Sequence, residues 1–165
     1  MDKQLQELLD KQAINEVIQR ISRTMDWLDD EGQASCYWPD AAIDFGFFVG
    51  RADDFVPFVM EHERKATKRW HMMSCASLKV DGDRAEAESY GITTGSVGSE
   101  ISLMFGGRYV DEFEKRDGEW RVSKRMYVLD WMKPFEDQSA GAQLEGGGMN
   151  TLDISETDHE LYRAM

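Results

Sequence analysis

One acid and one histidine, far apart in the chain, have the types and positions to act together as a general base. Asp26 stands where a long helix gives way to a sheet, and His71 stands at the start of a long strand. If the carboxylate contacts one ring nitrogen, it fixes the proton there and leaves the other nitrogen free to accept one. Without a nucleophile beside it, such a pair suits proton abstraction followed by loss of a leaving group, or movement of a double bond.

The helical pattern also supports a different role for Asp26. Apolar side chains recur every three or four residues from Leu5 to Leu28 and form one stripe. At about 100° per residue, Asp26 lies about 130° from the centre of that stripe. It can therefore pair with Arg23, three residues earlier, on a solvent-exposed face. A role in a pocket requires that the helix bends or that another element covers its far side.

Helices are predicted in two parts of the N-terminal half. The first covers residues 2–28, and we expect Gly32 to break it. One short helical turn within residues 33–38 is stopped by Pro39. A second amphipathic helix begins near residue 53 and ends near residues 65–68, because its apolar side chains keep a helical period.

Strands are predicted around and after the second helix. Two short extended pieces cover residues 41–45 and 47–49. From residue 70 the apolar period is two, which is typical of strands, and Gly106-Gly107 marks a bulge or bend at which the sheet curls. Tight turns at Asp81-Gly82 and Asp117-Gly118 and a looser turn at 95–99 join the long strands into an antiparallel meander. The long strands cover residues 71–80, 84–94, 101–114 and 119–131.

Helices followed by a bent sheet predict an α+β fold. We expect residues 1–135 to form one domain, in which a curved antiparallel sheet makes a cone and the N-terminal helices lie over its open side. Such a cone leaves a mostly apolar pocket at its mouth. Residues 136–165 are rich in Gly, Ser and acidic residues, so we expect a partly ordered tail with a place at an oligomer interface.

The composition excludes several classes of function. A net charge of −13 and a pI near 4.6 argue against binding to nucleic acid, which needs clustered Lys and Arg, and against anionic membranes. No apolar run has the length of a signal peptide or a membrane span, so we expect a cytoplasmic protein. The three histidines lack local ligand partners, and no phosphate or dinucleotide motif is present. We therefore expect neither a metal nor an organic cofactor.

The order of several short motifs along residues 5–135 resembles the SnoaL-like branch of the nuclear transport factor 2-like superfamily. The lindane dehydrochlorinase and scytalone dehydratase group is the most similar part of it. The resemblance implies the cone-shaped fold and assembly into dimers or trimers through the sheet. The motifs are Met25-Asp26, Tyr37-Trp38-Pro39-Asp40-Ala41, Gly50-Arg51, Trp70-His71, Val-Asp-Gly-Asp-Arg-Ala at 80–85 and the Asp-Gly-Glu-Trp hairpin within 112–125.

The resemblance also assigns roles to three residues. In that group an aspartate late in the first helix orients a histidine on the first long strand, which takes a proton from the substrate; these positions are Asp26 and His71. An arginine on the last strand corresponds to Arg125, which would stabilise a departing hydroxide or halide, or an enolate oxygen. Ile21 and Met25 stand where relatives carry a lysine or a tyrosine. These differences concern the leaving group and the substrate. They do not affect Asp26 and His71, which form the expected general base.

Other side chains are expected to complete the pocket. Strand alternation places Arg125 on one face with Tyr127 and Trp131, although Arg125 can also be a surface cation of a basic hairpin. Tyr37 and Tyr127 have hydroxyl groups that could donate a hydrogen bond to a substrate. The expected pocket residues are Tyr37, Trp38, Met73, Phe105, Tyr127 and Trp131.

Two functions fit these predictions. The first is a cofactor-independent lyase or isomerase, like a dehydratase or dehydrohalogenase, that acts on a small hydrophobic, cyclic molecule. The second is a non-catalytic ligand-binding or accessory subunit of the same fold, like the small subunit of ring-hydroxylating dioxygenases, because fold alone does not decide function. Contact between Asp26 and His71 beside an enclosed pocket favours the first function. In both cases we expect a homo-oligomer.

Overall fold

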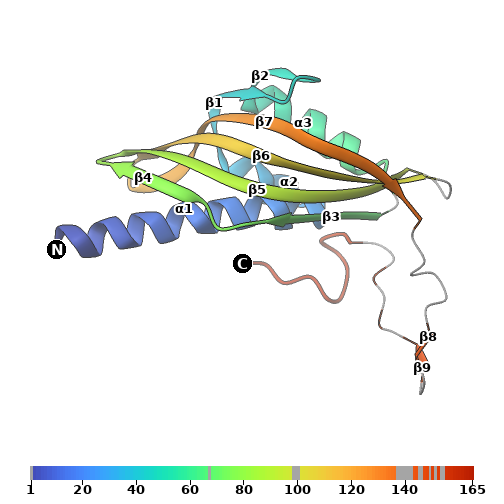
Figure 1. The fold of residues 1–165 in the computed structure, drawn as a ribbon. Coiled ribbons are helices and arrows are strands. Elements are labelled where there is room, and N and C mark those ends of the chain that lie inside the picture. The colour runs from blue at the N-terminus through green and yellow to red at the C-terminus, as the bar shows by residue number, and fades with distance from the viewer. Residues whose placement is uncertain are drawn as a thin grey trace.

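A curved, unclosed sheet with α1 along one of its faces forms the body of the protein (Figure 1). The computed structural model describes residues 2–66, 68–97, 101–136, 143–144, 147–148, 150, 152 and 155–165. The predicted α+β fold is confirmed. The helices are α1 (Lys3–Asp26), α2 (Asp30–Ser35) and α3 (Ala52–Glu63). The strands of the main sheet are β1 (Tyr37–Asp44), β2 (Val49–Arg51), β3 (Lys68–Met73), β4 (Ser77–Asp81), β5 (Arg84–Val97), β6 (Ile101–Arg116) and β7 (Glu119–Phe135).

The first helix is buried along its predicted apolar stripe only from Ile14 onward, because Leu5, Leu8 and Leu9 are exposed, and the helix ends differently from the prediction. The chain leaves the helix after Asp26, and Leu28 adopts a φ of 53°, with its side chain buried. Gly32 does not break this helix, because it lies inside α2. A Cβ on Gly32 would lie 2.5 Å from Oδ2 of Asp29, so glycine allows α2 to pack closely on its own N-terminal cap.

The strand order of the main sheet is β2-β1-β7-β6-β5-β3, with β4 also paired to β5. β1 pairs with β7 in parallel, so the sheet is mixed and the prediction of a purely antiparallel sheet is wrong in this respect. β1 also begins at Tyr37, earlier than predicted, and includes Pro39. The ladder to β7 is irregular between Tyr37 and Ala42, so the missing N–H of Pro39 interrupts no regular pairing.

The strand predicted at 71–80 is divided into β3 and β4, which pair with opposite halves of β5. Side chains take over the hydrogen bonds at the break. The Ser74 hydroxyl accepts from the backbone N–H of Tyr90 at 3.0 Å, and the side-chain oxygen of Asn15 accepts from the N–H of Ala76 at 3.0 Å. β3 begins at Lys68, so His71 lies within a strand rather than at its start.

The bulge predicted at Gly106-Gly107 is confirmed. Gly106 pairs with Trp131 and Gly107 pairs with Leu129, which leaves Asp130 as an extra residue on β7. A Cβ on Gly106 would lie 2.1 Å from the Trp131 ring, so glycine is required for this close approach. The bulge bends β6 and β7 and adds to the curvature of the sheet.

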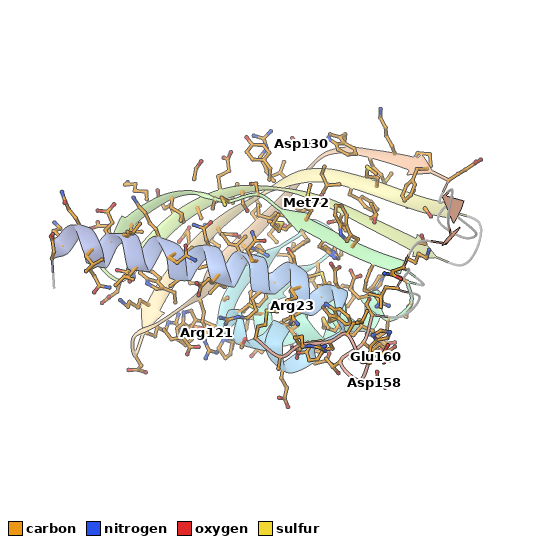
Figure 2. All side chains as sticks on the ribbon, turned by 90° about the horizontal axis from the view of Figure 1, so that it is seen from below. Arg23, Met72, Arg121, Asp130, Asp158 and Glu160 are labelled. Atoms are coloured by element: carbon orange, nitrogen blue, oxygen red, sulfur yellow. The ribbon has the colours of Figure 1, made fainter. Side chains whose placement is uncertain are left out.

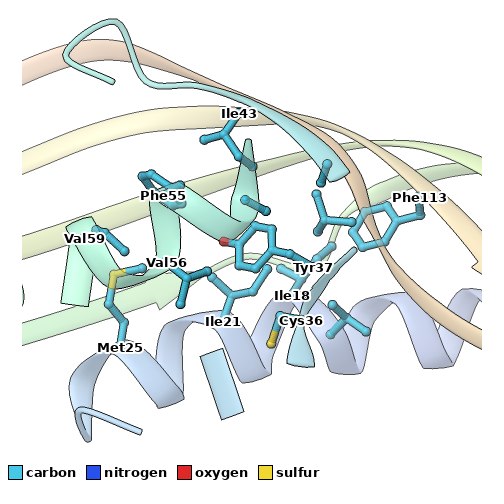
Figure 3. Close-up of a cluster of buried hydrophobic side chains, with 14 of the residues drawn as sticks. Ile18, Ile21, Met25, Cys36, Tyr37, Ile43, Phe55, Val56, Val59 and Phe113 are labelled. Atoms are coloured by element: carbon cyan, nitrogen blue, oxygen red, sulfur yellow. The ribbon is translucent and has the colours of Figure 1, made fainter. Parts of the chain in front are cut away.

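The buried core lies between the helices and the sheet (Figure 3). Ile18 and Ile21 of α1 and Phe55 of α3 pack there with Tyr37 of β1 and Phe113 of β6. Within the described residues, no helix combines the length and the apolarity that a bilayer crossing requires.

The C-terminal segment, residues 155–165, lies against the end of α1 (Figure 1). Residues 155–165 contain turns and no helix. Two very short strands, β8 (Gln143–Leu144) and β9 (Gly147–Gly148), pair with each other apart from the main sheet. Much of the predicted tail lies outside the described residues, as does part of the turn predicted at 95–99.

Candidate active site

Asp26 and His71 lie in contact. Asp26 is the last residue of α1, and His71 belongs to β3. One carboxylate oxygen, Oδ1, lies 2.7 Å from Nδ1 of His71, and the other, Oδ2, accepts a hydrogen bond from the backbone N–H of His71 at 3.1 Å. The side chains are 18% and 8% exposed, respectively. Two contacts from one carboxylate hold the imidazole in one orientation.

The far side of α1 is covered at this end, which is why Asp26 does not lie on a solvent-exposed face. β3 packs on one side, and the Ser155 hydroxyl donates to the backbone oxygen of Asp26 at 2.6 Å. Arg23 lies beside the C-terminal segment instead (Figure 2). It donates to the carbonyl of Arg163, and its guanidinium carbon is 4.9 Å from the centre of the Tyr162 ring. The alternative pairing of Arg23 with Asp26 is therefore wrong.

The contact with Asp26 decides which nitrogen of His71 carries the proton. An ionised carboxylate only accepts hydrogen bonds, so Nδ1 carries the hydrogen of the neutral ring and Nε2 keeps its lone pair. Asp26 would also stabilise the imidazolium that forms when Nε2 takes up a proton. This arrangement suits a general base for a molecule held beside His71.

A cavity of about 170 Å³ lies beside this pair, between α1, α3 and the inner face of the sheet, and His71 lines it. A protein cavity of about 150 Å³ holds one benzene molecule, so the space fits about one six-membered ring. Ile21 and Met25 add only apolar surface at the two positions where relatives carry lysine or tyrosine. The apolar wall includes Ile21, Met25, Phe45, Val59, Met73 and Phe105.

Arg125 lines the cavity but is not a free cation. It is 1% exposed, and its Nε and Nη2 atoms donate to the two carboxylate oxygens of Asp111 at 2.9 and 2.8 Å. Burial alone would lower the pKa of Arg125, but Asp111, together with Tyr37 and Tyr109, outweighs burial and raises the pKa above its ordinary value. The guanidinium thus keeps its positive charge, and the Asp111 carboxylate largely balances that charge. The alternative of a surface cation is wrong.

Tyr127 brings a phenol hydroxyl group to the cavity wall. Its ring stacks on Phe45, with ring centres 5.6 Å apart, and lies 4.9 Å from Tyr109. Burial raises the pKa of Tyr127 to about 12. The phenol therefore remains protonated at neutral pH and can donate a hydrogen bond into the cavity.

Tyr37 does not line this cavity. It is buried in the core (Figure 3). Its hydroxyl accepts a hydrogen bond from Nη1 of Arg125 at 3.3 Å. Its ring meets the ring of Phe55 edge to face, with centres 6.3 Å apart. Tyr37 thus supports a residue of the cavity wall, because β1 begins four residues earlier than predicted and carries its side chain into the core.

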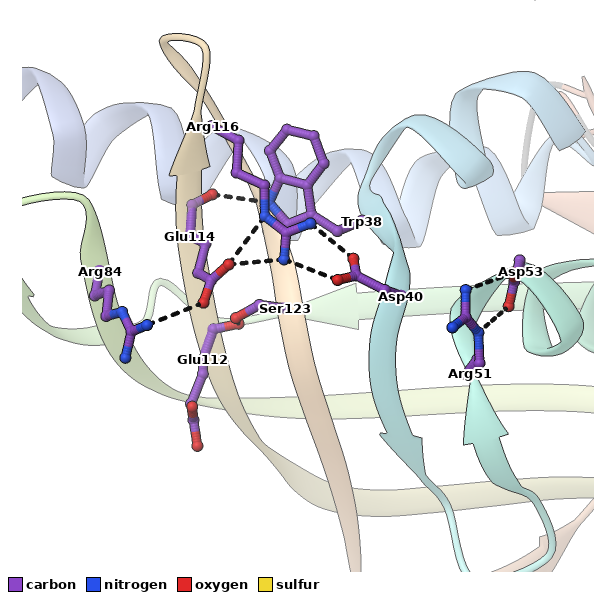
Figure 4. A network of polar contacts seen from close by, with 9 residues as sticks. All are labelled: Trp38, Asp40, Arg51, Asp53, Arg84, Glu112, Glu114, Arg116 and Ser123. Carbon is purple, nitrogen blue, oxygen red and sulfur yellow. Dashed lines mark hydrogen bonds and ion pairs between the residues drawn. The ribbon is translucent and has the colours of Figure 1, made fainter.

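Trp38 lies at the other end of the sheet, far from the predicted pocket wall. Its Nε1 donates to the backbone oxygen of Glu114 at 3.0 Å, and the guanidinium groups of Arg116 and Arg121 each lie 4.8 Å from its ring centre. Arg116 also pairs with Asp40 at 2.7 Å (Figure 4). Alternation along β1 explains the error, since Tyr37 and Trp38 point to opposite faces.

Trp131 lies on the outer face of the sheet, so its predicted place in the pocket is wrong. It pairs directly with Gly106, and directly paired residues share a face. Gly106 is adjacent to Phe105, whose side chain points into the cavity, and neighbours in a strand point to opposite faces. The extra residue Asp130 shifts the alternation of β7 by one and turns Trp131 outward.

Four polar residues of the cavity wall were not predicted as pocket residues from the sequence: Ser22 on α1, Glu63 at the end of α3, Thr93 on β5 and Tyr109 on β6. Glu63 follows the buried Val59 by four residues, so the helical period carried the signal. Ser22 is buried, and its hydroxyl has no hydrogen-bond partner among the described residues. In that same part of the chain, no three His, Cys, Asp or Glu side chains gather as ligands for a metal ion.

Comparison with known proteins decides the family. The sequence matches the family model of the SnoaL-like domain over residues 6–126. The chain belongs to the SnoaL-like family. A search of proteins with curated functions gives no significant match.

Solved structures share the fold of this SnoaL-like chain. The hexachlorocyclohexane dehydrochlorinase LinA-type3 of Novosphingobium barchaimii LL02 has a TM-score of 0.74 at 19% identity, over 91% of this chain and 100% of its own. A candidate scytalone dehydratase of Novosphingobium aromaticivorans gives 0.71 at 18% identity, over 80% and 91%. An NTF2-like protein with a cystatin-like fold, also from Novosphingobium aromaticivorans, gives 0.65 at 22% identity, over 77% and 86%. At these identities the likeness shows the fold.

Proposed function

We propose that the chain is a cofactor-independent lyase or isomerase that abstracts a proton from a small hydrophobic, cyclic molecule. The contact between Asp26 and His71 at the wall of an apolar cavity carries this proposal. Nε2 of His71 takes the proton, and Asp26 stabilises the resulting imidazolium. The dehydrochlorinase and the candidate dehydratase among proteins of the same fold support elimination as the reaction.

The other polar groups of the cavity have complementary roles in this proposal. Proton abstraction leaves negative charge on the substrate, and a donor placed beside that charge lowers the barrier. Tyr127 provides such a donor, since its hydroxyl stays protonated. Arg125 contributes less than a free cation would, because Asp111 already occupies two of its N–H groups. We assign Arg125 mainly to shaping the cavity and holding Tyr37 and Asp111 behind it.

A screen of cyclic alcohols, ketones and halides with one six-membered ring tests the proposal. We expect turnover with the parent protein and a loss of about 10² to 10⁴-fold in His71→Ala, the usual contribution of a general base. His62→Ala is the matched control, because His62 is exposed on α3 and does not line the cavity. Circular dichroism should show both variants folded.

The alternative of a non-catalytic binding or accessory subunit predicts a different result. In that case no member of the screen is converted, or conversion does not depend on His71, while a cyclic ligand still raises the melting temperature. Assembly into a homo-oligomer of two or three chains stays a prediction, which multi-angle light scattering checks directly.

A further inference from the structure

The carboxyl group of Glu63 belongs to the cavity wall, and proton abstraction by Asp26 and His71 does not use it. Glu63 is the last residue of α3 and lines the same cavity as His71 and Tyr127. The Nε atom of Arg69 donates to the backbone oxygen of Glu63 at 3.0 Å, and Arg69 precedes His71 by two residues on β3. This bond ties the end of α3 to the strand that carries the base. Glu63 and His71 both line the cavity, so a bound molecule can contact the two side chains together.

No cation neutralises the Glu63 carboxyl group by an ion pair among the described residues. The other Arg69 nitrogens donate to the backbone oxygen of Ala66 at 2.9 Å and to Ser155 at 3.3 Å. The ionisable groups around Glu63 are His71 and Arg69 on β3, Asp26 on α1, His62 on α3 and Tyr109 on β6. Burial raises the pKa of Glu63 above its ordinary value, with Asp26 acting in the same direction and His71 and Arg69 opposing. Glu63 therefore keeps its proton to a higher pH than an ordinary glutamate, and the protonated carboxyl group can donate a hydrogen bond.

Elimination of water needs such a donor, whereas elimination of halide does not. Hydroxide is a poor leaving group and departs readily only when a proton reaches its oxygen as the C–O bond breaks. On α1, Ile21 and Met25 offer no acidic hydrogen to the cavity. The buried hydroxyl of Ser22, which lacks a partner among the described residues, gives the same wall a further group that can hydrogen-bond a polar substrate.

We propose that Glu63 is the second catalytic residue of this cavity and gives its proton to a departing hydroxyl group, so that the chain acts on hydroxylated rings. This inference rests on the function proposed above. Nε2 of His71 takes the proton from carbon, and the electrons of that C–H bond form the new double bond. The C–O bond breaks toward oxygen, which takes the Glu63 proton and leaves as water. The imidazolium then returns its proton to the Glu63 carboxylate, so no other reactant is consumed.

Two probes that differ only in the leaving group test this assignment: 3-hydroxycyclohexanone and 3-chlorocyclohexanone, both of which give cyclohex-2-enone. Uncatalysed elimination is subtracted with His71→Ala. In Glu63→Gln, which keeps the size of the side chain but has no acidic proton, we expect conversion of the hydroxy probe to fall by about 100-fold or more. Conversion of the chloro probe should stay within about three-fold, since chloride leaves without a proton.

The pH profile gives a readout that a merely structural role would not change. The reaction requires one proton on the two groups Glu63 and His71 together. Conversion of the hydroxy probe by the parent should therefore show a bell-shaped dependence on pH. Glu63→Gln should lose the fall in conversion at high pH that reflects loss of the Glu63 proton. Glu61→Gln is the matched control, because Glu61 is exposed on the same helix and lies 4.0 Å from Lys65. It should leave both probes unaffected.

Each remaining outcome contradicts the assignment of Glu63. Equal loss with both probes would indicate a structural role, and no loss with either would show that Glu63 takes no part. Conversion of the chloro probe alone by the parent would overturn the role of Glu63 and leave the His71 base standing. Conversion of neither probe would count against the proposed function as well.

Discussion

Two nitrogen-bearing side chains of the cavity wall, Arg125 and His71, are each paired with a carboxylate behind the wall, and the two pairs differ in their exposure. Asp111 and Arg125 are 0% and 1% exposed, and their two parallel hydrogen bonds leave a permanent charge fully matched. Asp26 and His71 are 18% and 8% exposed, and Asp26 contacts only Nδ1 of the imidazole, so Nε2 is not used by this pair. A pair that is closed and cannot lose its proton stabilises the fold. A pair that is open on one side and titratable can do chemistry.

Among the variants that test this comparison, Asp26→Asn should have the largest effect, which is a loss of turnover. An amide can donate to Nδ1 of His71, which moves the ring hydrogen to Nε2 and removes the base. By analogy with the same change in a Ser-His-Asp triad, we expect turnover to fall by about 10⁴-fold. Urea unfolding should show a change of only about 1 kcal/mol. Asp30→Asn, in an exposed pair with Arg64, is the control.

Asp111→Ala should have its main effect on stability, in contrast to Asp26→Asn, whose main effect is on turnover. Removing one partner leaves the Arg125 charge buried and unmatched, which costs about 3–5 kcal/mol of the free energy of unfolding. Urea titration measures this loss. The double variant Asp111→Leu with Arg125→Met should recover most of it, since replacing both charges leaves none buried. A single variant as stable as the parent would show that the pair is not structural.

Glu63→Gln should have the smallest effect, and its sign depends on pH. The pKa of Glu63 is raised in the folded state from the ordinary value of 4.5, so the folded chain holds this proton more tightly than the unfolded chain. The contribution of the Glu63 side chain to stability is therefore lost as the pH rises above that value, and a glutamine side chain has no such dependence. We expect Glu63→Gln to melt about 1–3 °C higher at pH 7.5 and at the same temperature near pH 3.5. A lower melting temperature at pH 7.5 would contradict the raised pKa.

The fold followed from the sequence because the apolar periods and the turn residues agree along most of the chain. The helical stripe of α1, the bulge at Gly106-Gly107 and the hairpin at Asp117-Gly118 are local signals, and each is present in the structure. The parallel pairing of β1 with β7 has no local signal, because the paired residues are 82 or more positions apart in the sequence. Side chains from other elements likewise caused the break between β3 and β4.

The candidate site was only partly predictable for the same reason. The helical period placed Asp26 away from the apolar stripe, and only the resemblance to relatives favoured its contact with His71. The cover over that side comes from β3 and Ser155, which the sequence does not place there. The glycines that indicate the bulge are on β6, but its extra residue is Asp130 on β7. The sequence therefore did not show that the alternation of β7 shifts before Trp131, and Trp131 was assigned to the wrong face.

The proton position on His71 tests the central claim most directly. Long-range ¹⁵N–¹H correlation spectra of the labelled protein distinguish a protonated from an unprotonated ring nitrogen. At a pH where the ring is neutral, the account predicts a hydrogen on Nδ1 and none on Nε2, and a reversal of the two in Asp26→Asn. A hydrogen on Nε2 in the parent, or spectra that do not change in Asp26→Asn, would contradict it.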